Sequence, residues 1–161
     1  MDWGQDSNYT ALSIVNRTTR KEVFVGRWRR MPYSVIRQRI VRACKHWNVI
    51  RVTPEKNSMS SNVESLRDDF RAAEHQTSVV PFVMTNPDKH QLVTDFKEGY
   101  QTAGATWLKV SYATQELNTF VKKQNASLTW TYDTISDDTS DENEGAHGDT
   151  VIARLLAWPG S

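Results

Sequence analysis

Strand-like and helix-like patterns alternate along the whole of this 161-residue chain. Short apolar runs typical of strands are separated by longer stretches whose apolar residues recur every three or four positions, as on one face of a helix. The first two strands, Tyr9 to Val15 and Glu22 to Trp28, flank the polar turn NRTTR and predict an antiparallel hairpin. The order of elements predicts an α/β fold, a mixed sheet flanked by helices, in a single domain over residues 1–161.

Five helices and three further strands follow from the same patterns. Each expected helix carries one apolar stripe, and Ser61 and Glu64 have the spacing of a capping box. The polar, acidic stretch from Ser136 to Glu144 is expected to be a mobile loop. The helices are expected from Pro32 to about Trp47, from Ser61 through Ala73, from Asp88 through Tyr100, from about Thr114 to Lys123, and from Asp149 to the stop at Pro159 and Gly160. Trp47 and Tyr100 are expected on the buried faces of their helices. The strands are expected at Val49 to Val52, Val79 to Met84 and Leu128 to Tyr132.

Charges are segregated although the net charge is only +1. Ten Lys or Arg residues and the single acid Glu22 lie between Arg17 and Lys45, a segment we call the basic band. Such asymmetry favours a polyanionic partner, and an ordinary solvated surface is an equally good explanation. The lone Cys44 allows no internal disulfide, which fits a reducing compartment. No apolar run approaches the roughly 18 residues of a membrane span, so no membrane association is expected.

Three acids stand at element boundaries. Asp149 precedes the apolar run of the last helix, Asp2 precedes the first strand, and Glu55 ends the strand-like VIRVTPE. Asp149 alone is explained as well by helix capping. Side chains from one end of neighbouring strands converge on one pocket in open α/β sheets, and carboxylates crowded there require a cation. Oxygen ligands favour Mg²⁺ or Mn²⁺, and two such ions roughly 3.5–4 Å apart form the clamp used in phosphodiester cleavage.

Five segments resemble, in order, the motifs of one family. DWGQDSNYTALSIV is similar to an opening D-x-G and D-x-x-A before an apolar strand, and EKNSMSSNVESL to an E-x-N-S-M-G segment. PFVMTNPDK, TQELNTF and HGDTVIARLLAW match the later motifs. Over nearly its whole length the chain resembles the C-terminal nuclease domain of the large terminase subunit, the DNA-packaging motor of tailed bacteriophages, which has an RNase H-like fold.

The resemblance implies an endonuclease that cleaves concatemeric viral DNA with two Mg²⁺ or Mn²⁺ ions. It makes Asp2, Glu55 and Asp149 the catalytic and metal-binding acids. Asp6 and His147 match auxiliary positions, and Glu116 matches a position to which we assign a structural role. Implied partners are double-stranded DNA, the ATPase domain, the portal and the small terminase subunit, in the host cytoplasm at the procapsid. Contacts to DNA phosphates are expected from Arg27, Arg29, Arg30 and Lys89.

Several departures and alternatives accompany this interpretation. Gly148 stands where many members have an Asp, and Ser60 replaces a Gly. Only Met1 precedes Asp2, so the first strand is expected to be truncated, as in a trimmed chain, a split gene product or a fragment. The sequence has no phosphate-binding G-x-x-x-x-G-K-[ST] loop, so no ATP hydrolysis is expected. The alternatives are another RNase H-like nuclease such as a junction resolvase, a nonenzymatic nucleic-acid-binding module, and a docking domain of a virion assembly.

Overall fold

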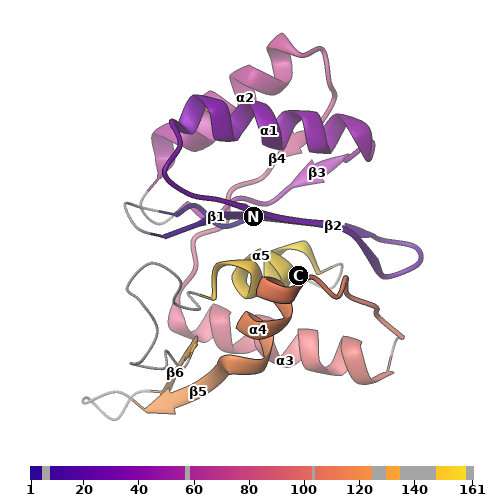
Figure 1. Cartoon of the computed structure of the whole chain (residues 1–161), viewed down its shortest axis with the longest axis vertical. Helices are drawn as coiled ribbons and strands as arrows, with labels where there is room; N and C mark the ends of the chain where they lie inside the picture. The colour runs from indigo at the N-terminus through magenta and orange to yellow at the C-terminus, as the bar shows by residue number, and fades with distance from the viewer. Residues whose placement is uncertain (5–7, 57–58, 103, 125–129, 135–147, 159–161) are drawn as a thin grey trace.

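The computed structural model describes residues 1–4, 8–56, 59–102, 104–124, 130–134 and 148–158. It confirms the expected mixed α/β class, with helices and strands interleaved along the chain (Figure 1). The elements are β1 (Thr10–Asn16), β2 (Lys21–Trp28), α1 (Tyr33–His46), β3 (Arg51–Val52), α2 (Ser60–Ala72), β4 (Ser78–Val79), α3 (Asn86–Thr102), α4 (Ser111–Thr119), β5 (Phe120–Gln124), β6 (Trp130–Thr134) and α5 (Asp149–Ala157).

The predicted hairpin is present. β1 and β2 pair antiparallel from Thr10 opposite Trp28 to Asn16 opposite Lys21, with a register shift between Ile14 and Val15. The Asn16 side chain accepts hydrogen bonds from the backbone of the turn that follows it, which stabilises the reversal. A second antiparallel hairpin, β5–β6, lies apart from the first, and β3 pairs parallel with β4.

Met1 and Asp2 join the first hairpin to the β3–β4 pair. Asp2 exchanges two backbone hydrogen bonds with Ala11, both 2.9 Å between nitrogen and oxygen. On the other side the Met1 nitrogen donates to the Thr53 carbonyl oxygen, and the Glu55 nitrogen donates to the Met1 carbonyl oxygen, each at 3.0 Å. These bonds join two separate strand pairs, so that β2, β1, the Met1–Asp2 segment, β3 and β4 lie side by side in this order as one sheet whose central member is the Met1–Asp2 segment.

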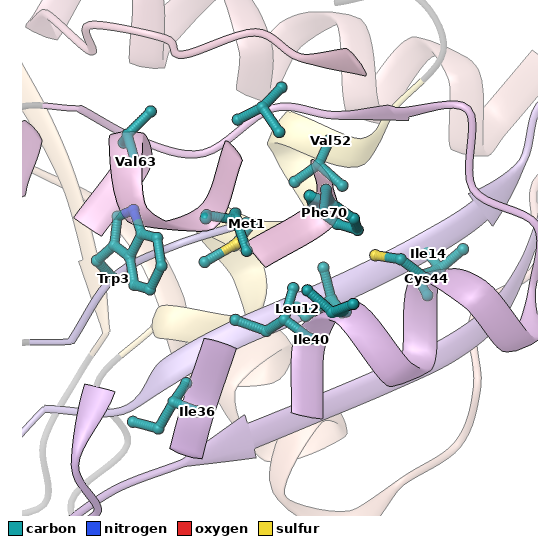
Figure 2. Packing of buried hydrophobic residues seen from close by; sticks show 13 residues of the cluster. Met1, Trp3, Leu12, Ile14, Ile36, Ile40, Cys44, Val52, Val63 and Phe70 are labelled. Carbon is teal, nitrogen blue, oxygen red and sulfur yellow. The ribbon is translucent and has the colours of Figure 1, made fainter. Parts of the chain in front are cut away.

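Helices cover both faces of this sheet. In Figure 1, α1 and α2 lie on one side of the strands, and α5 lies on the other side with α3 and α4 beyond it. Figure 2 shows the first core, where Met1 and Trp3 lie among side chains of β1, α1, β3 and α2. Its buried members are Met1, Trp3, Leu12, Ile14, Ile36, Ile40, Val41, Cys44, Val52, Val63, Leu66, Phe70 and Val79.

A second core joins α3, β6 and α5. Val151, Ile152, Leu155 and Leu156 of α5 pack there against Leu92, Val93, Phe96 and Tyr132. The close approach of α5 to α3 requires a glycine, because a Cβ atom on Gly99 would lie 1.9 Å from Cζ2 of Trp158. α5 is thereby held between the sheet and α3.

Some local expectations were wrong. Trp47 is 42% exposed and Tyr100 is 56% exposed, because Trp47 follows the end of α1 and Tyr100 lies in the last turn of α3, beyond the buried residues of each helix. Ser61 lies inside α2 and forms no capping box, because the helix begins one residue earlier after Met59. Lys123 belongs to β5 rather than to a helix, because β5 pairs with β6.

Candidate metal centre

Asp2 and Glu55 come from neighbouring members of the sheet. Asp2 lies in the central segment with only 8% of its surface exposed. Glu55 is half-buried and lies shortly after the end of β3. The Glu55 backbone is held between Met1 and Phe82, with which it forms a parallel bridge. Two acids predicted from separate motifs therefore lie at the same edge of the sheet, as parallel strands that end together require.

Asp149 is the first residue of α5 and is 6% exposed. Gly148, in the left-handed region at φ 73°, provides the turn into the helix, and no side chain caps this N-terminus from the N-cap position. The carboxylate of Asp149 accepts a hydrogen bond from the Tyr9 backbone nitrogen at 3.0 Å instead. Helix capping therefore does not account for Asp149.

Glu116, rather than Asp149, accepts a backbone hydrogen bond from the first turn of α5. Its Oε2 accepts hydrogen bonds from the Thr150 backbone nitrogen at 2.8 Å and from the Thr150 hydroxyl at 2.5 Å. Its Oε1 accepts from Nη1 of Arg27 at 2.8 Å. Because Glu116 is only 1% exposed, these bonds form away from water and tie α4, β2 and α5 together. These contacts match the structural role expected for Glu116.

The three acids influence one another electrostatically. Burial, a side-chain hydrogen bond with Glu55 and the charges of Glu55 and Asp149 raise the pKa of Asp2 well above its usual value. Burial raises the pKa of Asp149 to about 7, and the charges of Glu116 and Glu55 add to this, whereas the Tyr9 hydrogen bond and Arg27 oppose it. Without a cation, this part of the protein therefore retains protons near neutral pH.

The carboxylates suit a divalent ion in chemistry but are not arranged as a finished coordination shell. Among the described residues, no three His, Cys, Asp or Glu side chains are gathered closely enough to hold a metal as they stand. Asp2 and Glu55 share a hydrogen bond. The charge of Asp149 raises the pKa of Asp2, and the charge of Glu55 raises the pKa of Asp149. A divalent cation would replace the shared proton and draw the oxygens together, which is the usual remedy for crowded carboxylates.

Part of the basic band lies beside Asp149. The guanidinium groups of Arg27 and Arg29 lie over the Tyr9 ring, 4.2 and 4.6 Å from its centroid, and the backbone of that same Tyr9 bonds Asp149. Arg30 is exposed and follows directly, with φ 56°. The fourth predicted cation, Lys89, donates from Nζ to the Tyr132 carbonyl oxygen at 2.9 Å. Asp6 and His147 lie outside the described residues.

Sequence reasoning missed a buried ion pair behind the site. Arg154 of α5 donates from Nε and Nη2 to the two carboxylate oxygens of Glu22 at 3.0 and 2.8 Å. The side chains are 1% and 0% exposed. Arg154 also donates to the carbonyl oxygens of Leu108 and Ala113. A signal was available, because Glu22 is the single acid of the basic band and Arg154 interrupts an otherwise apolar run.

Comparison with known proteins identifies the fold. No protein-family model and no curated protein matches the sequence. The structure of the large terminase nuclease from thermophilic phage G20c is similar with a TM-score of 0.81 and 16% identity, covering 97% of this chain and 77% of that one. The chain has the fold of a large terminase nuclease domain. The same phage nuclease with bound magnesium matches at TM-score 0.76 and 16% identity (97% and 76% covered), and with bound cobalt at 0.71 and 14% (96% and 76%).

Within the described residues, no helix has the length and apolar character needed to cross a membrane.

Folding stability should depend on pH because of the raised pKa of Asp149. The folded chain keeps this proton up to about pH 7, whereas the unfolded chain releases it near the usual aspartate pKa of 3.8. Stability is therefore expected to be highest below about pH 4 with respect to this group and to fall as pH rises towards 7. The difference in Tm between Asp149→Asn and the parent chain, measured in a chelator between pH 5 and pH 8, isolates this contribution, because the buried Met1 amine, whose pKa is lowered to about 5, changes stability in the opposite direction in both proteins. The variant should gain stability relative to the parent as pH rises towards 7, and a difference that does not change with pH would contradict the assignment.

Proposed function

We propose that this chain is a divalent-metal-dependent endonuclease with an RNase H-like fold that hydrolyses phosphodiester bonds of double-stranded DNA. The observation that carries the proposal is that Asp2, Glu55 and Asp149, three buried or half-buried acids from separate parts of the sequence, lie close enough for the charge of one to raise the pKa of another. The terminase nuclease fold supports it, because this arrangement occurs in a fold whose G20c representative binds magnesium or cobalt.

Asp2, Glu55 and Asp149 would hold the metal, which we propose to be two Mg²⁺ or Mn²⁺ ions. Such ions activate a water molecule and stabilise the leaving oxygen in phosphodiester hydrolysis. The chain's own contribution is to orient the carboxylates. The Tyr9 backbone fixes one oxygen of Asp149, and the pairing of Met1 with Thr53 and Glu55 fixes the backbone that carries Asp2. Asp6 and His147 remain candidate auxiliary residues.

The DNA backbone would approach from the side of Tyr9. Arg29 and Arg30 follow the end of β2, and the guanidinium group of Arg29 lies over the ring of Tyr9, whose backbone nitrogen donates a hydrogen bond to the Asp149 carboxylate. Cations at this position would neutralise phosphates and leave base edges unread, which suits cleavage of many sequences. The biological substrate we propose is concatemeric viral DNA during packaging, with the ATPase domain, the portal and the small terminase subunit as partners at the procapsid in the host cytoplasm.

Cleavage of a supercoiled plasmid tests the activity. The purified chain is expected to produce nicked and linear forms with Mn²⁺, fewer with Mg²⁺, and none in a chelator. Mn²⁺ should work better because weakly arranged carboxylates bind Mg²⁺ poorly until a substrate phosphate completes the site. Asp68→Asn, which changes an exposed acid of α2, is the matched control and should cleave normally. If neither metal supports cleavage while the chain is folded and binds DNA, a nonenzymatic binding module is the better description.

Salt dependence tests the role of the arginines in DNA binding. The double variant Arg29→Ala/Arg30→Ala should weaken binding to unrelated duplexes equally and reduce the slope of log K against log salt by about 0.9 for each phosphate that is no longer neutralised. Arg27 is left in place because its ion pair with Glu116 supports the fold. Lys97→Ala removes an exposed cation of α3 and should leave the slope unchanged. An unchanged slope in the double variant would locate the DNA elsewhere.

A further inference from the structure

Asp149 is held from two sides, and both sides meet at one arginine. On the first side the Tyr9 backbone nitrogen donates a hydrogen bond to Oδ2 of Asp149 at 3.0 Å. On the second side Glu116 accepts hydrogen bonds from the backbone nitrogen and the hydroxyl of Thr150, the residue that follows Asp149. Arg27 contacts both sides, because its guanidinium group lies over the Tyr9 ring and donates to Glu116. We call these five residues the carboxylate clamp.

The carboxylate clamp joins four separate parts of the fold. Tyr9 precedes β1, Arg27 belongs to β2, Glu116 to α4 and Thr150 to α5. The N-cap residue Gly148 provides no side-chain cap for α5, so the first turn of this helix is held by contacts from the other elements. The direction of the carboxylate at that turn therefore depends on side chains that are distant in the sequence.

The contacts of Arg27 direct it towards its neighbours in the carboxylate clamp. Its guanidinium carbon lies 4.2 Å from the centroid of the Tyr9 ring and 4.3 Å from that of the Tyr112 ring. Its Nη1 donates to Glu116 at 2.8 Å, and the side chains of this pair are 21% and 1% exposed. A planar guanidinium group can lie over aromatic rings and pair with a carboxylate at once, which an ammonium group does less well.

We propose that Arg27 is a positioning residue for Asp149, which it holds through Tyr9 and Glu116 without touching metal or DNA. The inference rests on the proposed function, because Asp149 is one of the acids to which we assign the metal. Loss of a residue that only orients a metal ligand costs 10–100-fold in metal affinity or activity. Arg27 should therefore govern metal binding before any DNA is present, which a residue that only binds phosphate would not do.

Arg27→Lys tests the proposal, because it keeps the positive charge and loses the planar group that lies over two rings. Hydrogen exchange of the Tyr9 amide, followed by NMR on the full chain without metal, should become at least about tenfold faster. The amide of Ala11, which bonds the Asp2 carbonyl oxygen, should exchange as in the parent chain. The dissociation constant of Mn²⁺ without DNA, measured from the electron paramagnetic resonance signal of the free ion, should rise at least about tenfold.

Arg37→Lys is the matched control. Arg37 pairs with Asp69 at 2.6 Å, and its side chain is 16% exposed, close to the 21% of Arg27. This pair joins α1 to α2 and contacts no member of the carboxylate clamp in the described structure. The same substitution there should leave the exchange of the Tyr9 amide and the affinity for Mn²⁺ as in the parent chain.

A second variant tests the same contacts if Arg27→Lys does not fold. Tyr112→Leu removes one ring from the guanidinium group and leaves the ion pair with Glu116 in place. Exchange of the Tyr9 amide and the dissociation constant of Mn²⁺ should again rise. Tyr112→Phe keeps the ring and should behave like the parent chain.

Three results would overturn the proposal. The first is exchange of the Tyr9 amide at the parent rate in Arg27→Lys. The second is an equal acceleration at Ala11 or in Arg37→Lys, because a general loss of stability would then explain the change. The third is faster exchange at Tyr9 with the Mn²⁺ affinity of the parent. A parent chain that binds no Mn²⁺ counts against the proposed function instead, and the Tyr9 amide alone then decides whether Arg27 positions Asp149.

Discussion

Asp149→Asn is expected to lower divalent-dependent DNA cleavage by at least about a hundredfold, since even the loss of a residue that only supports a metal ligand costs 10–100-fold. The amide keeps the size of the side chain and still offers an oxygen to the Tyr9 nitrogen, but it lacks the charge that a divalent ion requires. Plasmid cleavage at saturating Mn²⁺ measures the loss.

The folded state of this variant should be at least as stable as that of the parent chain in a chelator. Burial already raises the pKa of Asp149 to about 7, so the site favours a neutral group. A melting temperature at or above that of the parent, together with lost cleavage, would separate a role in metal binding from a role in folding. Asp68→Asn again serves as the exposed control. Full cleavage by Asp149→Asn would exclude this residue from the site.

The regular elements could be predicted because their signals are local. The β1–β2 hairpin, α1 and the apolar stripe of α2 follow from periodicity within fewer than twenty residues, and the structure confirms them. Helix ends were predicted less well. The end of α4 and the start of β5 depend on pairing with β6, which the helix-like spacing of the residues from Thr114 to Lys123 does not reveal.

The candidate site was visible in the sequence only as acids at element boundaries. The raised pKa values of Asp2 and Asp149 depend on burial and on the charges of acids far away in the sequence, which the pattern does not reveal. Likewise, Arg27 was predicted only as a phosphate ligand, yet in the structure it is paired with Glu116 and stacked between Tyr9 and Tyr112. A charged residue in a basic segment can therefore belong to the packing of the fold.

The Arg154–Glu22 pair is the clearest case of an interaction that only the fold creates, because its members are 132 residues apart. Arg154→Met is expected to destabilise the protein by about 3–5 kcal/mol, since it leaves the Glu22 carboxylate buried without its cation. For a chain of this size that corresponds to a fall in Tm of roughly 6–20 °C. Thermal unfolding followed by circular dichroism measures the change.

Two controls separate burial from ion pairing as such. Arg71→Met breaks an exposed pair with Asp68 that has the same 2.8 Å nitrogen–oxygen distance as Arg154–Glu22, and it should change Tm little because water screens such pairs. The double variant Arg154→Met/Glu22→Gln removes both buried charges while the amide can still accept from the Ser13 hydroxyl, so it should recover much of the stability of the parent chain. If the double variant is as unstable as Arg154→Met, poorer packing and the missing hydrogen bonds to the Leu108 and Ala113 carbonyls, rather than an unpaired charge, cause the destabilisation.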